Sequence, residues 1–244
     1  MDIETQLVNN IIKPISISYF DGEKYKSFFI TKYKNINSML INAIKSLLIK
    51  EYNNYHVYLH NFNKFDGIFL LKIISSLSDN VDILIRDNDI IQIKFKFKIN
   101  NKKYVIYFYD SLLLLTSSLE KLAINFNVTN KTKFDFNKIN NSNNKTLLNK
   151  YKNKILKYKK NDCLVLSEII NKFNIEIYNM FSLCLSRFPT ISSLSFSVLR
   201  GKILTNSKIA ITNIKEYKIL KNSYKGGHVD VYRPTANKSQ WISA

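Results

Sequence analysis

The sequence predicts an α/β fold in which strands alternate with helices. Three observations carry the prediction: two strand-like runs near the N-terminus meet at a turn, an apolar repeat of helical spacing follows them, and another strand leads directly into a second helix. Elements that alternate in this way bury their apolar faces as layers, with the helices covering the sheet. The 244 residues suffice for one large domain or two modest ones.

The N-terminal segment predicts a strand, a hairpin and a helix. Residues 2–5 read as the end of a strand, and residues 15–20 and 25–30 form two strand-like runs around a turn at Asp21. Residues 36–51 carry their apolar side chains three and four positions apart, which is the spacing of one helical face. A helix therefore follows the hairpin.

The next segment predicts a strand, a helix and a group of three strands. Residues 55–59 are apolar enough for a buried strand, and a helix at residues 66–77 begins close behind it. Three strand-like runs follow, at residues 82–85, 90–99 and 103–109. The Asn pair at residues 100–101 supplies the turn between the last two runs. This order extends the α/β pattern.

Helices dominate the remainder of the chain. We expect them at residues 117–126, 147–160, 162–181 and 190–204, the second and third being continuous, and a short strand at residues 228–232. The Asn-rich residues 137–144 are typical of a loop. Pro189 ends the last long helix because the residue before a proline disfavours the helical region. We therefore expect one domain at residues 1–188 and a second region at residues 189–244.

The net charge of +19 is the most prominent compositional feature. A basic chain of this kind indicates a polyanionic partner such as nucleic acid, although heavy lysine and asparagine usage is also typical of an AT-rich coding sequence. The excess is uneven, because residues 1–140 carry a net charge of +6 and residues 141–244 a net charge of +13. The second part is therefore the expected nucleic-acid surface.

Several other classes of protein are excluded. No apolar run approaches the roughly 18 residues that a membrane span requires, so we expect no membrane partner. Cys163 and Cys184 are too few for a disulfide framework and lack the spacing of a zinc site, which indicates a reducing compartment. The first residues, Met-Asp-Ile-Glu, lack the pattern of a secretory signal or a transit peptide, so we expect neither.

Two short motifs near the N-terminus carry carboxylates. Asp2 and Glu4 are two positions apart in a strand, so both side chains point to the same face and can bind one metal cluster. The alternative is an exposed strand edge. Asp66 lies where a strand meets a helix, at the end of the sheet where open α/β folds place their sites. The alternative for Asp66 is a helix N-cap.

A third motif lies on the long helix. Tyr158 and Asp162 are separated by four positions and therefore lie one above the other on the same helical face. A phenol one turn from a metal-bound carboxylate can orient an attacking water. The alternative is a partly buried tyrosine beside a surface aspartate. Taken together, the four carboxylates of these motifs form a site for two hard divalent cations, which hydrolyse phosphodiesters by activating water.

The three motifs carry a family resemblance. In order, DIET, HNFNKFDG and YKKND resemble the exonuclease motifs of family B DNA polymerases in their tyrosine-type DEDD form; the histidine-type form would have His at position 157, which is Lys. The resemblance implies an RNase H-like fold and two bound ions, Mg²⁺ or Mn²⁺, held by the four carboxylates. It further implies that Tyr158 orients the nucleophilic water and that Asn61 and Phe65 contact the 3′ end of single-stranded DNA.

Three finer matches resemble the protein-primed branch of that family. Ser111 and Leu112 begin a pattern similar to the branch's S/T-L-x-x-h motif, which binds single-stranded DNA. Lys133 begins a pattern similar to its K-x-x-h motif, whose lysine supports catalysis. The segment at residues 224–227 resembles the YxGG motif between the exonuclease and polymerase domains, with Tyr224, Gly226 and Gly227 as its matching residues. The alternative for Ser111 and Leu112 is the plain start of a helix. The alternative for Lys133 is a solvated loop lysine, and for residues 224–227 it is an ordinary Gly-Gly turn.

The sequence thus predicts the exonuclease portion of a protein-primed DNA polymerase, followed by the start of a polymerase domain. The family's polymerase motifs D-x-x-S-L-Y-P and D-T-D are absent, and Asp2 follows the first residue directly, so we expect a truncated fragment that does not polymerise. Expected partners are single-stranded DNA, primer-template DNA and a terminal priming protein, with the chain a monomer. AT-rich composition and the resemblance to plasmid polymerases favour a mitochondrial location. Two alternatives remain: a free-standing DEDD exonuclease and a non-catalytic nucleic-acid-binding remnant.

Overall fold

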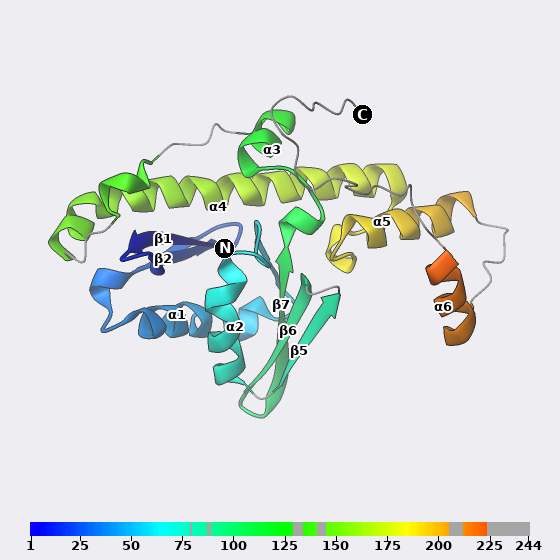
Figure 1. Ribbon diagram of the computed structural model, residues 1–244, viewed down its shortest axis with the longest axis horizontal. Coiled ribbons are helices and arrows are strands. Elements are labelled where there is room, and N and C mark those ends of the chain that lie inside the picture. The colour runs from blue at the N-terminus through cyan, green and yellow to red at the C-terminus, as the bar shows by residue number, and fades with distance from the viewer. Residues whose placement is uncertain (79, 87–88, 129–133, 141–144, 205–211, 224–244) are drawn as a thin grey trace, which may run out of the picture. The chain divides into compact units, whose positions relative to one another are not determined.

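Two sheets form the middle layer of the protein, and helices pack on both sides of them (Figure 1). The computed structural model describes residues 1–78, 80–86, 89–128, 134–140, 145–204 and 212–223. It divides the chain into two compact units, Met1–Ile203 and Leu204–Ala244. The domain limits expected from the sequence stay a prediction. Within the described residues, no helix combines the length and apolar character needed to cross a membrane.

The first sheet contains three antiparallel strands in the order β1-β2-β3. They are β1 (Asp2–Val8), β2 (Ile11–Phe20) and β3 (Tyr25–Phe29). The predicted hairpin is confirmed, and Asp21 closes its turn by accepting from the backbone N–H groups of Glu23 and Lys24 at 3.0 and 2.7 Å. Both strands of the first pair are longer than predicted, because Asn9 and Asn10 adopt left-handed φ values of 51° and 59° and form an additional tight turn.

The second sheet is mixed and has the order β4-β7-β6-β5. Its strands are β4 (His56–Leu59), β5 (Val81–Arg86), β6 (Asp89–Ile99) and β7 (Lys102–Asp110). The two edges of β7 differ, because β4 pairs with it in parallel and β6 pairs with it antiparallel. The predicted Asn100 and Asn101 turn is confirmed by φ values of 49° and 62°. The parallel pair aligns Leu59 with Asp110, so the C-terminal ends of β4 and β7 lie together.

Two helices cover one face of the sheets. Helix α2 (Asp66–Leu77) has the predicted bounds, whereas α1 (Ile36–Lys45) ends six residues earlier than predicted and a 3₁₀ turn, Lys50–Tyr52, follows. Their apolar sides share one core with both sheets, built around Met39, Leu40, Ile44, Leu70, Ile74, Ile17, Ile93, Phe95, Ile106 and Phe108. The two sheets are therefore held in one layer by a common core.

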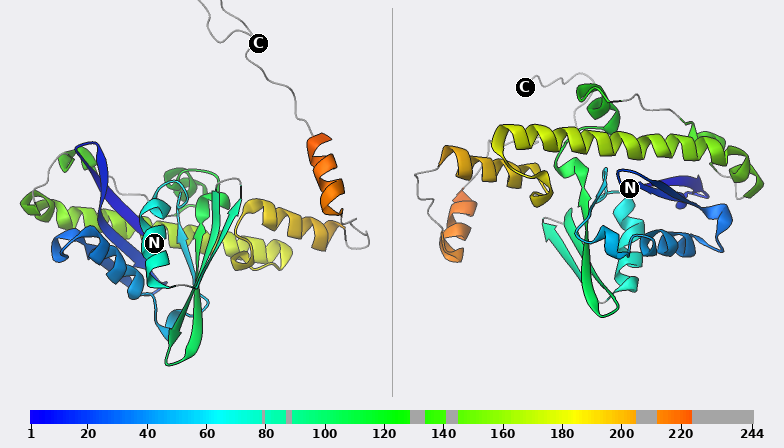
Figure 2. Two further views of the ribbon diagram at one scale, coloured as in Figure 1. Left: turned by 60° about the horizontal axis from the view of Figure 1, so that its bottom comes forward. Right: turned by 180° about the vertical axis from the view of Figure 1, so that it is seen from behind.

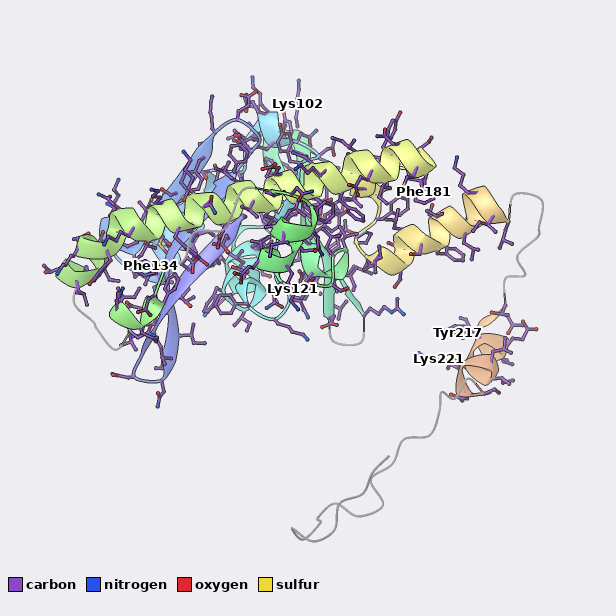
Figure 3. The ribbon with its side chains drawn as sticks, turned by 90° about the horizontal axis from the view of Figure 1, so that it is seen from above. Lys102, Lys121, Phe134, Phe181, Tyr217 and Lys221 are labelled. Atoms are coloured by element: carbon purple, nitrogen blue, oxygen red, sulfur yellow. The ribbon has the colours of Figure 1, made fainter. Side chains whose placement is uncertain are left out.

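The long helix α4 (Lys145–Phe181) lies on the opposite side of the sheets (Figures 1 and 2). It confirms the prediction that the two helical segments are continuous. Helix α3 (Leu119–Asn125) packs beside its middle, as the position of Lys121 shows in Figure 3. After α4, the chain forms α5 (Ile191–Val198), as predicted, and a π-helical turn, Leu199–Ile203. Helix α6 (Ile214–Ser223), in the second unit, was not predicted, and the predicted strand at residues 228–232 lies outside the described residues.

Candidate metal centre

Three carboxylates from two distant elements meet between β1 and α4. Asp2 and Glu4 project from β1, Asp162 projects from α4, and one oxygen from each lies within 4.8 Å of the others. Asp2 and Glu4 are half-buried and Asp162 is 6% exposed. The interpretation of Asp162 as a surface aspartate is therefore wrong. Asp2 and Glu4 do lie on an edge strand of the first sheet, although neither side chain is exposed. Burying clustered like charges requires a compensating partner.

Asp66 lies beside this cluster. Its side chain is 3% exposed, and its Oδ1 accepts a hydrogen bond of 3.0 Å from the backbone N–H of Ile3, the residue between Asp2 and Glu4. Asp66 is the first residue of α2, and Phe65 occupies the N-cap position without a capping side-chain bond. The N-cap interpretation of Asp66 is therefore wrong. The carboxylate faces β1 instead of its own helix.

Backbone constraints set the position of Asp66. Residue 67 must be glycine, because a Cβ there would lie 2.8 Å from the carbonyl oxygen of Phe62. That same oxygen accepts from the Gly67 N–H at 2.7 Å. The chain reaches this tight connection through Asn61, whose φ of 66° lies in the left-handed region that asparagine tolerates better than most residues. The local backbone conformation therefore explains the presence of Asn61 and Gly67 in this motif.

A buried aspartate that sequence reasoning missed organises the same loop. Asp110, at the end of β7, is 2% exposed. Its Oδ1 accepts from the backbone N–H groups of Asn61 and Leu112, both at 2.9 Å, and its Oδ2 accepts from the N–H of Asn63 at 3.0 Å. One carboxylate therefore holds the loop after β4 against the turn after β7. The sequence does contain a signal for this role: an aspartate directly before Ser-Leu at the end of a strand commonly caps the turn that follows.

Three further residues predicted to contact DNA, namely Ser111, Leu112 and Phe65, belong to that loop and that turn. Ser111 is fully buried; its Oγ donates to the carbonyl oxygen of Leu59 at 3.1 Å and lies 3.0 Å from His60 Nδ1. Leu112 and Phe65 are half-buried. Ser111 therefore stabilises the junction of β4 and β7, and this structural role does not depend on any contact with DNA. Lys133, Tyr224, Gly226 and Gly227 lie outside the described residues.

The electrostatics of the centre suit cations. Burial, and then the charge of Asp2, raises the pKa of Glu4 well above its usual range and raises the pKa of Asp66 to about 8. The buried Oδ2 of Asp2 has no hydrogen-bond partner among the described residues. Clustered, poorly solvated carboxylate oxygens are the donors that Mg²⁺ and Mn²⁺ prefer, so the residues present fit divalent ions.

Two residues of α4 complete the surroundings. Burial, and then the charge of Asp162, raises the pKa of Tyr158, and a side-chain hydrogen bond between the two adds to this shift. The phenol is therefore protonated at neutral pH. Lys159 is fully buried, and burial lowers the pKa of its ammonium while the charges of Asp2 and Glu4 oppose that shift. Its Nζ donates to the carbonyl oxygen and Oγ of Ser16 at 2.6 and 3.1 Å.

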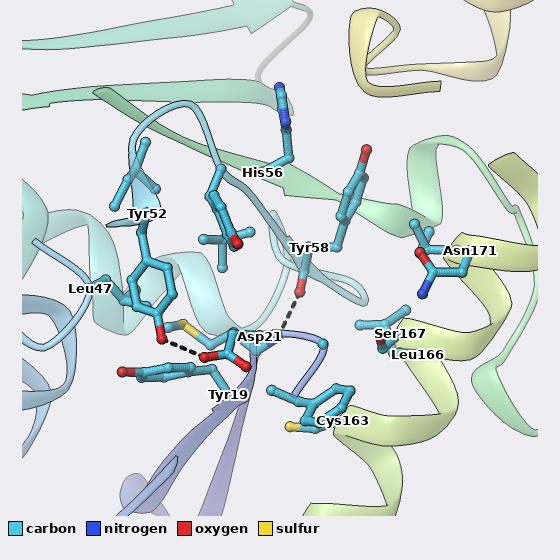
Figure 4. A pocket seen from close by; sticks show the side chains of 17 residues that line it. Tyr19, Asp21, Leu47, Tyr52, His56, Tyr58, Cys163, Leu166, Ser167 and Asn171 are labelled. Carbon is cyan, nitrogen blue, oxygen red and sulfur yellow. Dashed lines mark hydrogen bonds between the residues drawn. The ribbon is translucent and has the colours of Figure 1, made fainter. Parts of the chain in front are cut away.

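A cavity of about 250 Å³ lies close by at the seam between the sheets (Figure 4). Tyr58 and His56 line one side of it, and Cys163 of α4 lines another. The ammonium of Met1 donates to the carbonyl oxygen of Tyr58 at 2.8 Å across this seam. None of the four carboxylates is among its described lining residues, so the candidate metal centre is a separate feature.

We expect the metal-free protein to lose stability as pH rises from about 4 to about 8. The folded chain holds a proton on Asp66, with its pKa of about 8, that an unfolded aspartate with a pKa of about 3.9 has released. Stability therefore falls across this window, by at most about 1.4 kcal/mol per pH unit for one group. Thermal unfolding in EDTA at several pH values checks this. Asp66→Asn is expected to flatten the dependence, and an equally steep fall in that variant would contradict the assignment.

Comparison with solved structures identifies the fold. Phi29 DNA polymerase complexed with single-stranded DNA aligns with 93% of this chain and 39% of its own, with a TM-score of 0.67 and 18% identity. Phi29 DNA polymerase complexed with primer-template DNA gives a TM-score of 0.67 and 19% identity. The predicted RNase H-like α/β fold is thereby confirmed.

Sequence comparison identifies the family. The family described as "DNA polymerase type B, organellar and viral" matches residues 47–240. A protein of Neurospora intermedia named "Probable DNA polymerase" is 32% identical over 93% of this chain, and one of Ascobolus immersus with the same name is 35% identical over 96%. The chain belongs to the organellar and viral type B DNA polymerases, which confirms the resemblance to the protein-primed branch. It spans 27% and 22% of the length of these two relatives.

Proposed function

We propose that this chain carries the 3′→5′ exonuclease centre of a protein-primed family B DNA polymerase. The observation that supports this most directly is the convergence of Asp2, Glu4 and Asp162 within 4.8 Å, next to the buried Asp66. Four ionised carboxylates in one poorly solvated place destabilise a protein unless protons or cations offset their charge, and bound cations would do so at neutral pH. The substrate class follows from the family and from the net charge of +19, which favours a polyanion.

Each residue of the centre has a role in this proposal. The four carboxylates hold two Mg²⁺ or Mn²⁺ ions, which supply an activated water and neutralise charge on the leaving oxygen of the phosphodiester. The Tyr158 phenol is protonated and lies one helical turn from Asp162, to which it donates in the metal-free structure; with ions bound to Asp162, the hydroxyl would turn to the attacking water and orient it. Asn61, Phe65 and the turn at Ser111 and Leu112 hold the 3′ end of a single strand. Asp110 keeps these two DNA-contacting segments together.

The broader partners and location belong to the same proposal. Single-stranded DNA and primer-template DNA are the partners named for the phi29 structures, and we extend both to this chain. The resemblance to the protein-primed branch supports a terminal priming protein as a partner and action as a monomer. AT-rich composition and the resemblance to plasmid polymerases support a mitochondrial location. The proposed roles of Lys133 in catalysis, and of Tyr224, Gly226 and Gly227 in passing the primer strand, concern residues outside the described part.

A cleavage assay tests the proposal. We expect purified protein to shorten 5′-labelled single-stranded DNA one nucleotide at a time from the 3′ end with Mg²⁺ or Mn²⁺, and to leave it intact with EDTA. With Mg²⁺, a 3′-phosphorothioate linkage should slow the reaction, because its sulfur binds this hard cation poorly. Binding of DNA without any metal-dependent shortening would support the non-catalytic alternative. Cleavage of RNA as fast as DNA would favour a free-standing nuclease.

A further inference from the structure

Helix α4 is bonded to β2 directly behind the metal-binding residues of β1. The Lys159 ammonium donates to Ser16, and the Cys163 thiol donates to the carbonyl oxygen of Ser18 at 3.8 Å. In the antiparallel ladder, Ser16 is paired with Glu4 and Ser18 is paired with Asp2. The helix is therefore connected to the two strand residues that lie opposite the DxE carboxylates.

The spacings of the two elements match. Residues 159 and 163 are four apart, which is a rise of about 6 Å along a helix. Ser16 and Ser18 are two apart, which is about 6.8 Å along a strand. Both bonds consequently form in only one register of α4 along β2. Tyr158 and Asp162 each precede one of the bonded residues, so the same register determines where the phenol and the third carboxylate of the cluster lie.

The strand needs this support at Ser16. The β1–β2 ladder shifts register between Glu4 and Thr5, so that Glu4 pairs with Ser16 whereas Thr5 pairs with Pro14. Such a bulge interrupts the ladder locally, and Pro14 has no N–H with which to restore it. The carbonyl oxygen of Ser16, beside the bulge, receives the 2.6 Å bond from Lys159.

Burying a lysine at this position costs free energy of folding. Lys159 is 0% exposed, and a buried ammonium costs several kcal/mol unless it is paired. Methionine or leucine would fill the same volume without that penalty. The nearby charges of Asp2 and Glu4 favour the ammonium, but its hydrogen bonds of 2.6 and 3.1 Å go to Ser16 of the strand. A need to fix the position of that strand explains why a buried donor is present.

We propose that Lys159 is a positioning residue of the metal centre: it fixes the register of α4 on β2 and thereby brings Asp162 to Asp2 and Glu4. This inference rests on the proposed function, because it concerns the same centre. Lys159 does not contact the DNA or the reacting atoms. Its effect reaches the chemistry only through the relative positions of the strand and the helix.

The test compares Lys159→Met with Lys160→Met, the neighbouring exposed lysine on the same helix. Mn²⁺ binding is measured by electron paramagnetic resonance on folded protein, and kcat and KM are measured on single-stranded DNA. We expect Lys159→Met to bind Mn²⁺ about tenfold more weakly and to lose at least about tenfold in kcat, with an unchanged KM for DNA. Lys160→Met should match the wild type in Mn²⁺ affinity and kcat.

The outcomes separate three roles of Lys159. A lower unfolding temperature with unchanged Mn²⁺ affinity would show a merely structural role and overturn the proposal. Tighter Mn²⁺ binding would show that the ammonium acts by charge alone and would also overturn it. If Lys159→Met does not fold, Ser16→Ala, which removes one acceptor of the ammonium, should weaken Mn²⁺ binding severalfold, and unchanged binding would count against the proposal. A wild-type chain that binds Mn²⁺ without cleaving DNA refutes the proposed function, while Mn²⁺ affinity still decides this inference.

Discussion

Replacing Asp66 with asparagine is expected to reduce metal-dependent shortening of single-stranded DNA by at least about a thousandfold. The substitution retains an oxygen that accepts the 3.0 Å hydrogen bond from the Ile3 N–H, so the contact between α2 and β1 survives. It removes one carboxylate ligand from the centre that we propose holds two cations. The loss should therefore appear in kcat and in metal affinity, while the protein stays folded. Single-turnover kinetics at saturating Mg²⁺ measures the rate.

Asp82→Asn is the matched control for this prediction. Asp82 is exposed on β5 and forms a surface ion pair of 2.7 Å with Lys96. An exposed pair of this kind contributes little to stability, and it has no connection to the acidic cluster. We expect wild-type rates from Asp82→Asn. Equal rates from Asp66→Asn and the wild type would show that the cleavage, if present, comes from another site or from a contaminating nuclease.

Local patterns predicted the elements that carry the centre. The bounds of α2 and the continuity of α4 followed from apolar spacing, which depends on residues a few positions apart. The same applies to the turn at Asn100 and Asn101, whose residue type favours left-handed φ. These features are determined by nearby residues, so the sequence alone predicts them.

The residues that sequence reasoning missed act over long separations. Asp110 binds backbone groups 47 and 49 residues earlier, and this depends on the parallel pairing of β4 with β7. Lys159 binds Ser16 across 143 residues and looks like one more lysine in a basic helix, because Lys157 and Lys160 beside it are exposed. Its spacing of four residues from both Ile155 and Cys163 places it on the buried face of α4, but a lysine is rarely fully buried, so its residue type predicts exposure. The packing of α4 on β2 shows that it is buried.

Tyr158→Phe is expected to lower kcat by about a hundredfold and to leave KM for DNA and Mn²⁺ affinity unchanged. The phenyl ring keeps the edge-to-face contact with Phe136, whose ring centroid lies 5.7 Å away. The substitution therefore removes the hydroxyl and preserves the ring packing. Because burial and the charge of Asp162 raise the pKa of Tyr158, the group acts as a hydrogen-bond donor and not as a base. The wild-type rate should therefore show no increase that tracks ionisation of a tyrosine between neutral pH and about pH 10.

Tyr151→Phe provides the comparison on the same helix. Tyr151 is half-buried, and the centroid of its ring lies 6.1 Å from that of Phe134. Its packing therefore resembles that of Tyr158, although the two residues are about two helical turns apart. Removal of its hydroxyl should leave kcat at the wild-type value. A hundredfold loss in both variants would indicate that α4 tolerates no change of this kind. A loss in Tyr158→Phe alone, with metal affinity intact, assigns the hydroxyl to the step in which water attacks the phosphodiester.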